Sequence, residues 1–421
     1  MSGLNFLNKL LDGVDVEWLS LGELGDFIRG NGLQKKDFVE SGFPAIHYGQ
    51  IYTRYGLSAD KTFTYVLPEL ANKLRKAQKN DLLLATTSEN DEDVVKPLAW
   101  LGDNVAISGD MMLFRHEQNV KYLAYFFQSE IFQTQKMKYI TGAKVRRVSS
   151  GDLSKIKIPI PCSNNPEKSL AIQSEIVRIL DKFTALTAEL TAELTAELNM
   201  RKKQYNYYRD QLLSFKEGEV EWKTLGEVAK IQRGASPRPI VNYLTEQGNG
   251  IPWIKIGDTI PGSKYIDKTL QKITAEGAQK SRILNPGDFV ISNSMSFGRP
   301  YILRITGAIH DGWASISNFS EKLNADYLYH YLSSKKVKIY WESKINSGSV
   351  SNLNADIIKT LPVPLPDKQK QERISALLDK FDTLTNSITE GLPREIELRQ
   401  KQYEYYRDLL FSFPKPETVS N

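Results

Sequence analysis

Basic side chains gather in two stretches of the chain that could bind a nucleic acid. The stretch 131–151 contains five cations and no acid, and the stretch 333–354 contains four lysines and one acid. The cations are Lys136, Lys138, Lys144, Arg146 and Arg147 in the first stretch, and Lys335, Lys336, Lys338 and Lys344 in the second. Lysine and arginine neutralise DNA phosphates and release their bound counterions. We therefore expect both stretches to contact a phosphate backbone, although any single residue could equally be a solvated surface charge.

Base readout is a second chemistry that the sequence offers. Arg146 or Arg147 could donate two hydrogen bonds to O6 and N7 of guanine, and Asn293 or Asn352 could bind adenine in a similar way. Two pairs of loops add further candidates, because their glycines and serines would let the backbone approach a ligand closely. The loops 28–38 and 231–241 follow matching Gly-Glu segments, and the loops 86–96 and 292–300 follow apolar stretches. Their candidate DNA-binding residues are Lys35, Lys36, Thr87, Ser88, Arg233, Arg238, Asn293, Ser294 and Arg299.

The sequence contains no recognisable catalytic constellation. It lacks a Gly-rich phosphate loop ending in Gly-Lys-Ser/Thr, a His-Glu-x-x-His pair and the Asn/Asp-Pro-Pro-aromatic motif of adenine methyltransferases. Its four histidines are scattered, and the pair His310-Asp311 lacks a nucleophile elbow. Cys162 is the single cysteine, so neither an intrachain disulfide nor a cysteine-based zinc site can form. We expect a non-enzyme with no catalytic, cofactor or metal site of its own.

Length and composition indicate a folded protein of several domains. The chain has 421 residues, of which 41% are apolar and 25% charged, and this balance is typical of globular proteins. A formal net charge of +5 permits a nucleic-acid partner without requiring one. The N-terminus lacks the pattern of a signal peptide, and no run of 18 apolar residues occurs, so we expect a cytoplasmic protein.

The elements that must position these residues occur twice along the chain. The segment 201–215 recurs as 399–413 with eleven of fifteen positions identical, at an offset of 198 residues. The Leu-Asp-Lys-Phe sequence 180–183 returns at the same offset, and the segment 16–23 returns as 220–227 at an offset of 204. A duplicated chain predicts pseudo-twofold symmetry. We expect a first domain over 1–165, a central helix over 166–217, a second domain over 218–366, and a C-terminal helix and tail over 367–421.

Each half has the pattern of a mixed α/β domain. Apolar runs rich in β-forming residues predict strands at 81–88 and 288–294, and the segments 120–135 and 325–341 are typical of helices. Near the end of each half, prolines alternate with aliphatic residues, at Pro159, Pro161, Pro364 and Pro366. Proline cannot donate to a sheet, so these segments predict edge strands or extended linkers.

Three consecutive copies of Thr-Ala-Glu-Leu fill residues 187–198 of the central helix. Their leucines fall four apart and predict one aliphatic stripe, whose counterpart at the 198 offset keeps aliphatic residues. The two stripes are Leu186, Leu190, Leu194 and Leu198, and Leu384, Ile388, Leu392 and Ile396. We expect two helices of equal length to pack through these stripes, except that Gly391 and Pro393 are expected to kink or restart the second helix.

This layout resembles the specificity subunits of type I restriction–modification systems. The resemblance rests on the Leu-Gly-Glu segments, the proline-rich strands, the Leu-Asp-Lys-Phe helices and the tetrapeptide copies, and it covers essentially the whole chain. It implies an α+β fold, with two pseudo-twofold-related mixed α/β target-recognition domains separated by two long antiparallel helices. It also implies sequence-specific binding of a bipartite double-stranded DNA target by a non-catalytic subunit, with the helix length setting the spacing of the half-sites.

The resemblance further implies partners and site residues. Two methyltransferase subunits and the restriction/translocase subunits would bind this chain, and S-adenosylmethionine, ATP and Mg²⁺ would be bound by those partners. The resemblance assigns DNA contacts to Asn293, Ser294, Arg299, Ser349 and Asn352, and the internal repeat extends them to Thr87, Ser88, Lys144, Arg146 and Arg147. The acidic stretch 89–93 departs from the glycine-containing loop that is usual in this family.

Two other functions remain open from the sequence. The chain could be a structural coiled-coil scaffold that joins two protein-binding domains, which predicts no salt-dependent affinity for DNA. It could also be an enzyme with an unrecognised site, which predicts turnover by the chain alone. The two tyrosine-rich blocks within 201–215 and 399–413 could bind methyltransferase subunits or pack against the neighbouring domain.

Overall fold

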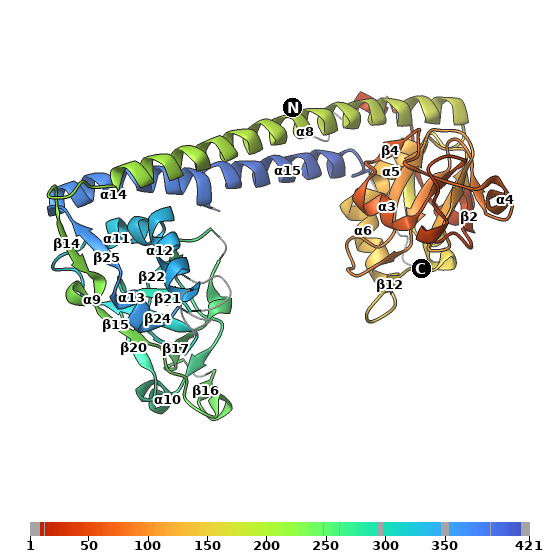
Figure 1. Cartoon of the computed structure of the whole chain (residues 1–421). Coiled ribbons are helices and arrows are strands. Elements are labelled where there is room, and N and C mark those ends of the chain that lie inside the picture. Colours follow the sequence, from red (N-terminus) through yellow and green to blue (C-terminus); the bar gives the residue numbers. More distant parts are fainter. Residues whose placement is uncertain are drawn as a thin grey trace. The chain divides into compact units, whose positions relative to one another are not determined.

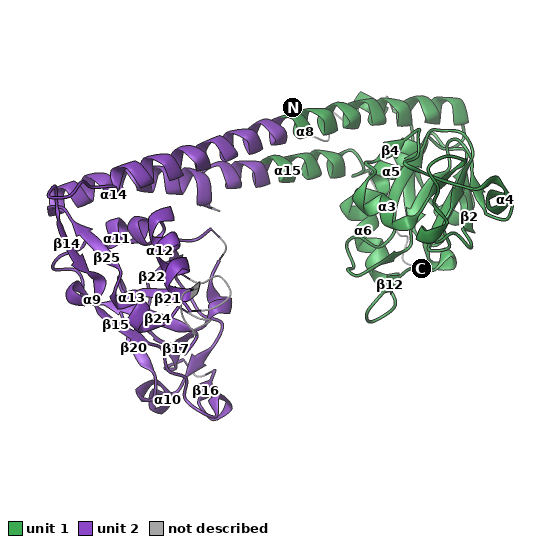
Figure 2. Cartoon of the chain, in the orientation of Figure 1, with its two compact units in different colours: residues 1–189, 399–421 green, residues 190–398 purple. Residues whose placement is uncertain are grey.

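The protein contains two mixed α/β units joined by long helices. The computed structural model describes residues 9–11, 13–246, 248–260, 262–293, 298–346, 353–387 and 389–413. Unit 1 comprises residues 1–189 and 399–421, and unit 2 comprises residues 190–398 (Figure 2). Helix α8 (Pro166–Leu212) continues from unit 1 into unit 2, and α15 (Leu392–Leu409) continues from unit 2 into unit 1. Each unit therefore contains part of both long helices.

Unit 1 is built on a five-stranded sheet in the order β2-β11-β7-β9-β4 and a four-stranded sheet in the order β5-β3-β10-β6. Two-stranded ladders β1-β13 and β8-β12 complete it. The strands are β1 (Val16–Ser20), β2 (Gly25–Arg29), β3 (Phe43–Ile46), β4 (Ser58–Ala59), β5 (Thr64–Val66), β6 (Lys76–Ala77), β7 (Leu82–Ala85), β8 (Thr87–Ser88), β9 (Lys96–Trp100), β10 (Val105–Ile107), β11 (Met111–His116), β12 (Arg146–Arg147) and β13 (Lys157–Pro161). The shorter helices are α2 (Leu21–Leu24), η1 (Lys35–Asp37), α3 (Tyr48–Thr53), α4 (Pro68–Ala71), α5 (Val120–Gln128), α6 (Glu130–Lys136), η2 (Met137–Tyr139) and α7 (Ser150–Leu153).

Unit 2 has two five-stranded sheets, in the orders β15-β24-β21-β22-β18 and β16-β19-β17-β23-β20, and the ladder β14-β25. The strands are β14 (Glu221–Thr224), β15 (Lys230–Arg233), β16 (Leu244–Thr245), β17 (Ile251–Ile254), β18 (Tyr265–Ile266), β19 (Lys272–Ile273), β20 (Arg282–Leu284), β21 (Phe289–Ser292), β22 (Pro300–Leu303), β23 (Gly307–Ile309), β24 (Trp313–Ser317) and β25 (Pro362–Leu365). The helices are α9 (Leu225–Val228), η3 (Ile240–Asn242), η4 (Ile256–Asp258), α10 (Ala275–Gln279), α11 (Ala325–Leu332), α12 (Lys335–Asn346), α13 (Ala355–Lys359) and α14 (Lys368–Asn386).

The proline-rich segments form strands, as predicted. In unit 1, β13 pairs antiparallel with β1 and places Pro159 opposite Trp18. In unit 2, β25 pairs antiparallel with β14 and places Pro364 opposite Trp222. Both strands of a two-stranded ladder are edge strands, so the missing proline N–H groups cost no ladder hydrogen bond.

The Leu-Gly-Glu segments form equivalent one-turn helices, α2 and α9. The backbone N–H of Ser20 donates to Glu23 Oε2 at 2.7 Å, and that of Thr224 donates to Glu227 Oε2 at 2.7 Å. The intervening glycine is required by close packing, because a Cβ added at Gly22 would lie 3.0 Å from Ser154 Cβ. A Cβ at Gly226 would meet Lys359 Cβ at the same distance.

Two predicted helices are each divided in two. The segment 120–135 forms α5 and α6, which are separated at Ser129 because its Oγ accepts the backbone N–H of Phe132 and caps the second helix. The segment 325–341 forms α11 and α12, and here Ser334 Oγ accepts the backbone N–H of Val337. Both breaks are local hydrogen-bonding effects that the apolar pattern does not report.

The cores of both units include residues from the tyrosine-rich repeat. In unit 1, the ring of Phe411 lies 5.2 Å from that of Tyr122 and 5.7 Å from that of Phe126. In unit 2, Tyr205 is buried, and its hydroxyl lies 2.8 Å from Nδ1 of the fully buried His330. Each copy of the repeat thus contributes an aromatic side chain to the core of one unit.

Helix pairing is confirmed within each unit. In unit 1, the ring of Phe183 on α8 stacks on Tyr406 of α15 at 5.3 Å. In unit 2, Phe381 of α14 stacks on Tyr208 of α8 at 5.6 Å. Phe183 and Phe381 are equivalent at the 198 offset, as are Tyr208 and Tyr406, so the duplication preserves the same packing contact.

The second long helix is interrupted, in contrast to α8, which has 47 residues without a break (Figure 1). Helix α14 ends at Asn386, and α15 begins at Leu392. The prediction of two helices of equal length is therefore wrong, whereas the expected restart of the second helix is present. Gly391 has a φ of +81°, and a Cβ there would lie 2.6 Å from the carbonyl oxygen of Thr383. Pro393 falls in the first turn of α15, where its missing N–H costs no helical bond.

The predicted leucine stripe is only partly buried. The prediction that Leu186 packs against the other helix is wrong, because 51% of this residue is exposed. The less exposed positions along this part of α8 are Thr184, Thr187, Leu190, Thr191, Leu194, Glu197 and Leu198. They follow a spacing of three and four residues, so the packing period is close to 3.5 and the strict tetrapeptide period drifts away from it. Ile388, in the counterpart stripe, lies outside the described residues.

Candidate nucleic-acid interface

Four predicted residues of unit 1 meet in one short ladder. Strand β8 pairs antiparallel with β12, so that Arg146 is opposite Ser88 and Arg147 is opposite Thr87. The turn between Thr141 and Arg147 is closed by two backbone hydrogen bonds of 2.9 Å, and Lys144 is exposed within it. Residues almost sixty positions apart in the sequence therefore form one polar surface.

The exposure of these residues differs. Arg147 is exposed and Ser88 is half-buried, whereas Thr87 is buried with 6% exposed. Thr87 Oγ1 is one of the buried polar atoms without a hydrogen-bond partner among the described residues. Buried polar groups are usually satisfied, so Thr87 Oγ1 is an exception, and its burial keeps it out of direct reach of a ligand, contrary to the expectation that Thr87 contacts DNA.

Arg146 is held by the acidic loop that follows β8. Its Nε lies 2.8 Å from Asp91 Oδ1, and its Nη1 donates to the carbonyl oxygen of Gly142. The contact with Asp91 is an ion pair without hydrogen-bond alignment, since Asp91 Oδ1 accepts no hydrogen bond among the described residues. About a third of each side chain is exposed, so the Arg146 side chain is partly accessible.

Lys136 cannot contact a phosphate, contrary to the expectation from its place in the basic stretch. It is fully buried, and its Nζ donates to the carbonyl oxygens of Glu92 at 2.9 Å and Val94 at 3.0 Å. Burial lowers the pKa of Lys136 to about 8, against the opposing effect of nearby carboxylates. This lysine supports the acidic loop from within.

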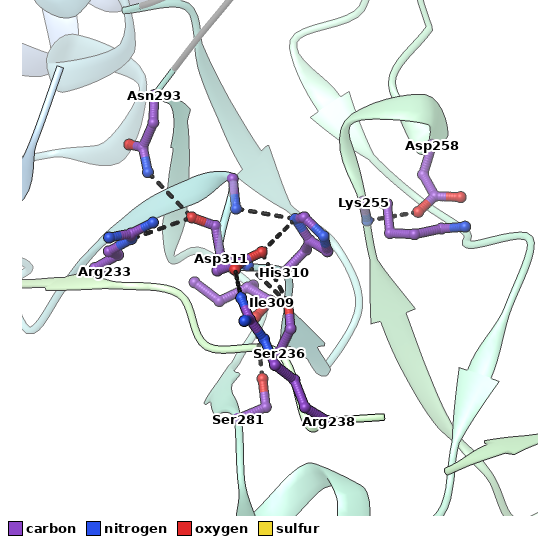
Figure 3. Close-up of polar contacts among 11 residues, drawn as sticks. Arg233, Ser236, Arg238, Lys255, Asp258, Ser281, Asn293, Ile309, His310 and Asp311 are labelled. Carbon is purple, nitrogen blue, oxygen red and sulfur yellow. Dashed lines mark hydrogen bonds and ion pairs between the residues drawn. The ribbon is translucent and has the colours of Figure 1, made fainter. Parts of the chain in front are cut away.

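In unit 2, Asp311 connects three predicted residues (Figure 3). Its carbonyl oxygen accepts from Arg233 Nε and from Asn293 Nδ2, each at 3.4 Å. Its carboxylate accepts from Ser236 Oγ at 2.9 Å and pairs with Arg238 Nη2 at 3.2 Å. Burial acts to raise the pKa of Asp311, but Ser236, His310 and Arg238 together lower it, so the carboxylate stays ionised and orders the surrounding cations.

The remaining candidates are dispersed or outside the described residues. Arg299 is exposed and lies over the ring of Tyr301 at 5.2 Å. Lys35 and Lys36 are exposed on η1 and are not part of the β8-β12 ladder. Ser294, Ser349 and Asn352 lie outside the described residues. The lysines at 335, 336 and 338 are exposed on α12.

The structure adds two residues that sequence reasoning missed. Arg29 Nε donates to the carbonyl oxygen of Gly109 at 2.9 Å, as Arg233 does to that of Asp311. Thr86 Oγ1 donates to the carbonyl oxygen of Asp110 at 3.0 Å, and the strand registers make Thr86 the counterpart of Asn293. The sequence contains a pattern that could have identified Arg29. Its Arg-Gly pair recurs at Arg233, at the same offset of 204 as the Leu-Gly-Glu segments.

Neither a metal-binding cluster nor a membrane-spanning helix is present among the described residues. In the described part of the chain, no group of three or more histidine, cysteine or acidic residues is arranged to hold a metal ion. None of the described helices combines the length and the apolar character needed to cross a membrane.

Comparisons with known proteins agree with these observations. Residues 13–200 and 217–398 each match the family model described as "Type I restriction modification DNA specificity domain". The Escherichia coli "Type I restriction enzyme EcoR124I/EcoR124II specificity subunit" is 44% identical over 429 residues and is covered completely, as is this chain. The Escherichia coli "Type I restriction enzyme EcoprrI specificity subunit" is 35% identical, with 93% of each chain covered.

Solved structures share the fold at low sequence identity. A chain from a structure described as "Structural basis underlying complex assembly and conformational transition of the type I R-M system" matches with a TM-score of 0.66 and 18% identity, covering 94% of this chain and 97% of that one. The HsdS subunit from Thermoanaerobacter tengcongensis matches with a TM-score of 0.53 and 18% identity, covering 94% and 96%.

Proposed function

The chain belongs to the type I restriction–modification DNA specificity family, and on this premise we propose that each of its units reads one half of a split double-stranded DNA sequence. The observation that carries the proposal is that both units place an arginine in the same way at the edge of a sheet. Arg29 and Arg233 make the same hydrogen bond in the two units, and each lies at the end of an equivalent strand. A proposed DNA-contacting edge that occurs once in each unit suits a target with two half-sites.

The residues proposed for DNA contact combine phosphate and base chemistry. Arg147, Lys144 and Arg299 are exposed cations that can neutralise phosphates. Arg146 and Asn293 are half-buried and partly fixed by the protein, which suits base readout because a fixed donor discriminates better than a mobile one. We add Arg29 to the phosphate-binding group as the counterpart of Arg233.

Catalysis is proposed to reside in partner subunits. Two methyltransferase subunits would use S-adenosylmethionine, and restriction/translocase subunits would use ATP and Mg²⁺, while this chain supplies the target sequence. The sequence supports this division, because it contains none of the motifs for nucleotide hydrolysis or adenine methylation.

Exposed tyrosines are the proposed docking sites for the methyltransferase subunits. Tyr207 is 62% exposed and Tyr405 63% exposed, although each has a buried or half-buried tyrosine two residues earlier. Each packs edge-on against the next tyrosine at 5.4 Å, so the same aromatic surface occurs in both repeats. Aromatic side chains are common interface anchors, and two identical surfaces suit two copies of one partner.

Helix α8 is proposed to set the distance between the half-sites. Each Thr-Ala-Glu-Leu copy adds about 6 Å of helix and about 40° of rotation, while one base pair advances the duplex by about 3.4 Å. An uninterrupted helix transmits such a change along its whole length.

Salt-dependent DNA binding tests the proposed function. The chain, assembled with its methyltransferase subunits, should bind duplex DNA with an affinity that falls steeply as salt rises. Arg147→Ala should reduce the affinity, and Lys203→Ala, which removes an exposed lysine from the helical repeat, should leave it unchanged. The absence of salt-dependent binding would favour a scaffold that joins two protein-binding domains.

A further inference from the structure

The acidic loop of unit 1 is rigid in a way that its composition does not suggest. Two side chains hold its backbone: the buried Lys136 through the carbonyl oxygens of Glu92 and Val94, and the half-buried Tyr52 through those of Thr87 and Asp93. At its tip, the Asn90 side chain donates to Asp93 Oδ2 at 2.8 Å and accepts from the backbone N–H of Asp93 at 2.7 Å. The position of Asp91 between these fixed points is therefore set before any ligand arrives.

Asp91 in turn fixes Arg146, one of the two arginines in the β8-β12 ladder. Arg146 is constrained at its Nε by the charge of Asp91 at 2.8 Å and at its Nη1 by the carbonyl oxygen of Gly142. Its backbone is fixed by pairing with Ser88. By contrast, Arg147, its immediate neighbour, is exposed, and no acid pairs with it among the described residues.

The hydrogen-bonding capacity left on Arg146 matches a base edge. A guanidinium has five N–H groups, and one N–H on Nη1 is used by Gly142. The other Nη1 hydrogen and both Nη2 hydrogens find no acceptor among the described residues, so both terminal nitrogens keep donors for O6 and N7 of guanine. A carboxylate beside the arginine also disfavours a phosphate at the same place, because like charges repel.

The sequence of the equivalent loop in unit 2 contains no residue that could replace Asp91. The sequence from Asn293 to Arg299 contains no acid, whereas 89–93 contains Glu89, Asp91, Glu92 and Asp93. The acidic loop is thus a property of one recognition domain, as expected of a device that serves one particular half-site.

We propose that Asp91 is a positioning residue for base readout, which holds Arg146 in the orientation that selects one guanine in the half-site read by unit 1. Asp91 acts through Arg146 and does not itself bind the base. The proposal rests on the proposed function, since it requires that unit 1 reads DNA.

Selection from a randomised duplex library tests the proposal. The full chain with its methyltransferase subunits is incubated with the library, and bound duplexes are sequenced. Arg146→Ala should reduce the preference for one guanine about tenfold, as expected for loss of a bidentate contact. Asp91→Ala should weaken the preference at that same position by a similar factor, and so should Asp91→Asn, because the amide keeps the size of the side chain and loses the charge that holds Arg146. Preferences in the other half-site should not change, and this provides an internal control.

Two further variants separate positioning from charge. Glu89→Gln removes one exposed acid from the same loop and should leave the guanine preference intact. The double variant Asp91→Ala/Arg146→Ala should be no less selective than Arg146→Ala alone, because the two residues act as one unit. Thermal melting of each variant confirms that it is folded.

Different results would contradict the role of Asp91 and the proposed function of the chain. If Asp91→Ala keeps the full preference at the position lost in Arg146→Ala, or raises affinity for all sequences equally, the positioning role is wrong. If Arg146→Ala loses no preference while the parent still selects a split sequence, this inference fails and the proposed function stands. If the parent selects no sequence at all, the proposed function fails and takes this inference with it.

Discussion

Arg29 and Arg233 occupy the same place in the two halves of the chain. Each ends its strand, and each donates its Nε to the backbone carbonyl two residues before the strand that pairs with its own. The strand registers agree, since Arg29 is opposite Met112 and Arg233 is opposite Ala314. The duplication is therefore preserved down to a single side-chain contact at the edge that we assign to DNA.

Removing either arginine tests that assignment. Arg29→Ala and Arg233→Ala should each weaken binding to all duplexes by a similar factor and reduce the slope of log affinity against log salt by about 0.9, the value for one phosphate contact. Arg178→Ala is the matched control, because it removes an exposed arginine that pairs with Glu175 on α8. Binding isotherms at several salt concentrations measure the slope. An unchanged slope in both variants would rule out phosphate contact.

Lys136 predicts a distinct dependence of stability on pH. Its folded-state pKa of about 8 lies below the ordinary value of 10.5, so the unfolded chain binds more protons between these two values. The free energy of unfolding should therefore rise with pH in this window, by about 2 kcal/mol between pH 7.5 and 9.5. Denaturant unfolding of the full chain at both pH values measures the change.

The variant Lys136→Met isolates this effect. It removes the titrating amine, so the rise between pH 7.5 and 9.5 should be smaller by the same amount. The variant should also be destabilised at neutral pH, by about 1–3 kcal/mol, because the carbonyl groups of Glu92 and Val94 lose their donor. Identical pH dependence in the parent and the variant would mean that the buried lysine does not titrate in this range.

A deletion within α8 tests the helix as a spacer. Removing Thr191–Leu194 shortens the helix by about 6 Å and turns it by about 40°. The gap between the half-sites should shrink by about one to two base pairs, while both half-sites keep their sequence. Replacing the same four residues with alanine keeps the length and should keep the gap. Sequencing of selected duplexes reads both quantities, and an unchanged gap in the deletion variant would refute the spacer role.

The exposed tyrosines predict how many methyltransferase subunits bind. Tyr207→Ala or Tyr405→Ala alone should weaken one of two binding events by about 2 kcal/mol and leave the other intact. The double variant should weaken both. Leu270→Ala is the control, because it removes an exposed apolar side chain of unit 2 that is 82% accessible. Mass photometry gives the stoichiometry, and two bound subunits with unchanged affinity in the double variant would contradict the docking site.

Local patterns in the sequence were sufficient for much of the fold. The duplication, the strands β7 and β21, the proline-rich strands and the long helices follow from residue periodicity and repeated segments. Proline spacing predicted β13 because the absence of an N–H has the same consequence wherever it occurs. Ser129 was missed because a serine that caps a helix and one that lies within it look alike in an apolar pattern.

The site was predicted less well, because its geometry depends on contacts between distant segments. Thr87 and Ser88 pair with Arg146 and Arg147 in one ladder, and no pattern in the sequence indicated that these segments would meet. The burial of Lys136 was not foreseen, since a charge in a basic stretch is usually solvated and only the fold shows the carbonyl groups that compensate it. Asp91 was read as part of an acidic stretch, and its role beside Arg146 follows from the folded loop alone.

The most direct test of the proposal that each unit recognises one half-site is to map modified adenines in cells that express this chain with its methyltransferase partner. We predict one split motif, with a modified adenine in each half and a fixed gap between them. Arg146→Ala should relax one half of the motif and leave the other unchanged. A single uninterrupted motif, or a split motif in which that substitution alters both halves equally, would contradict the account.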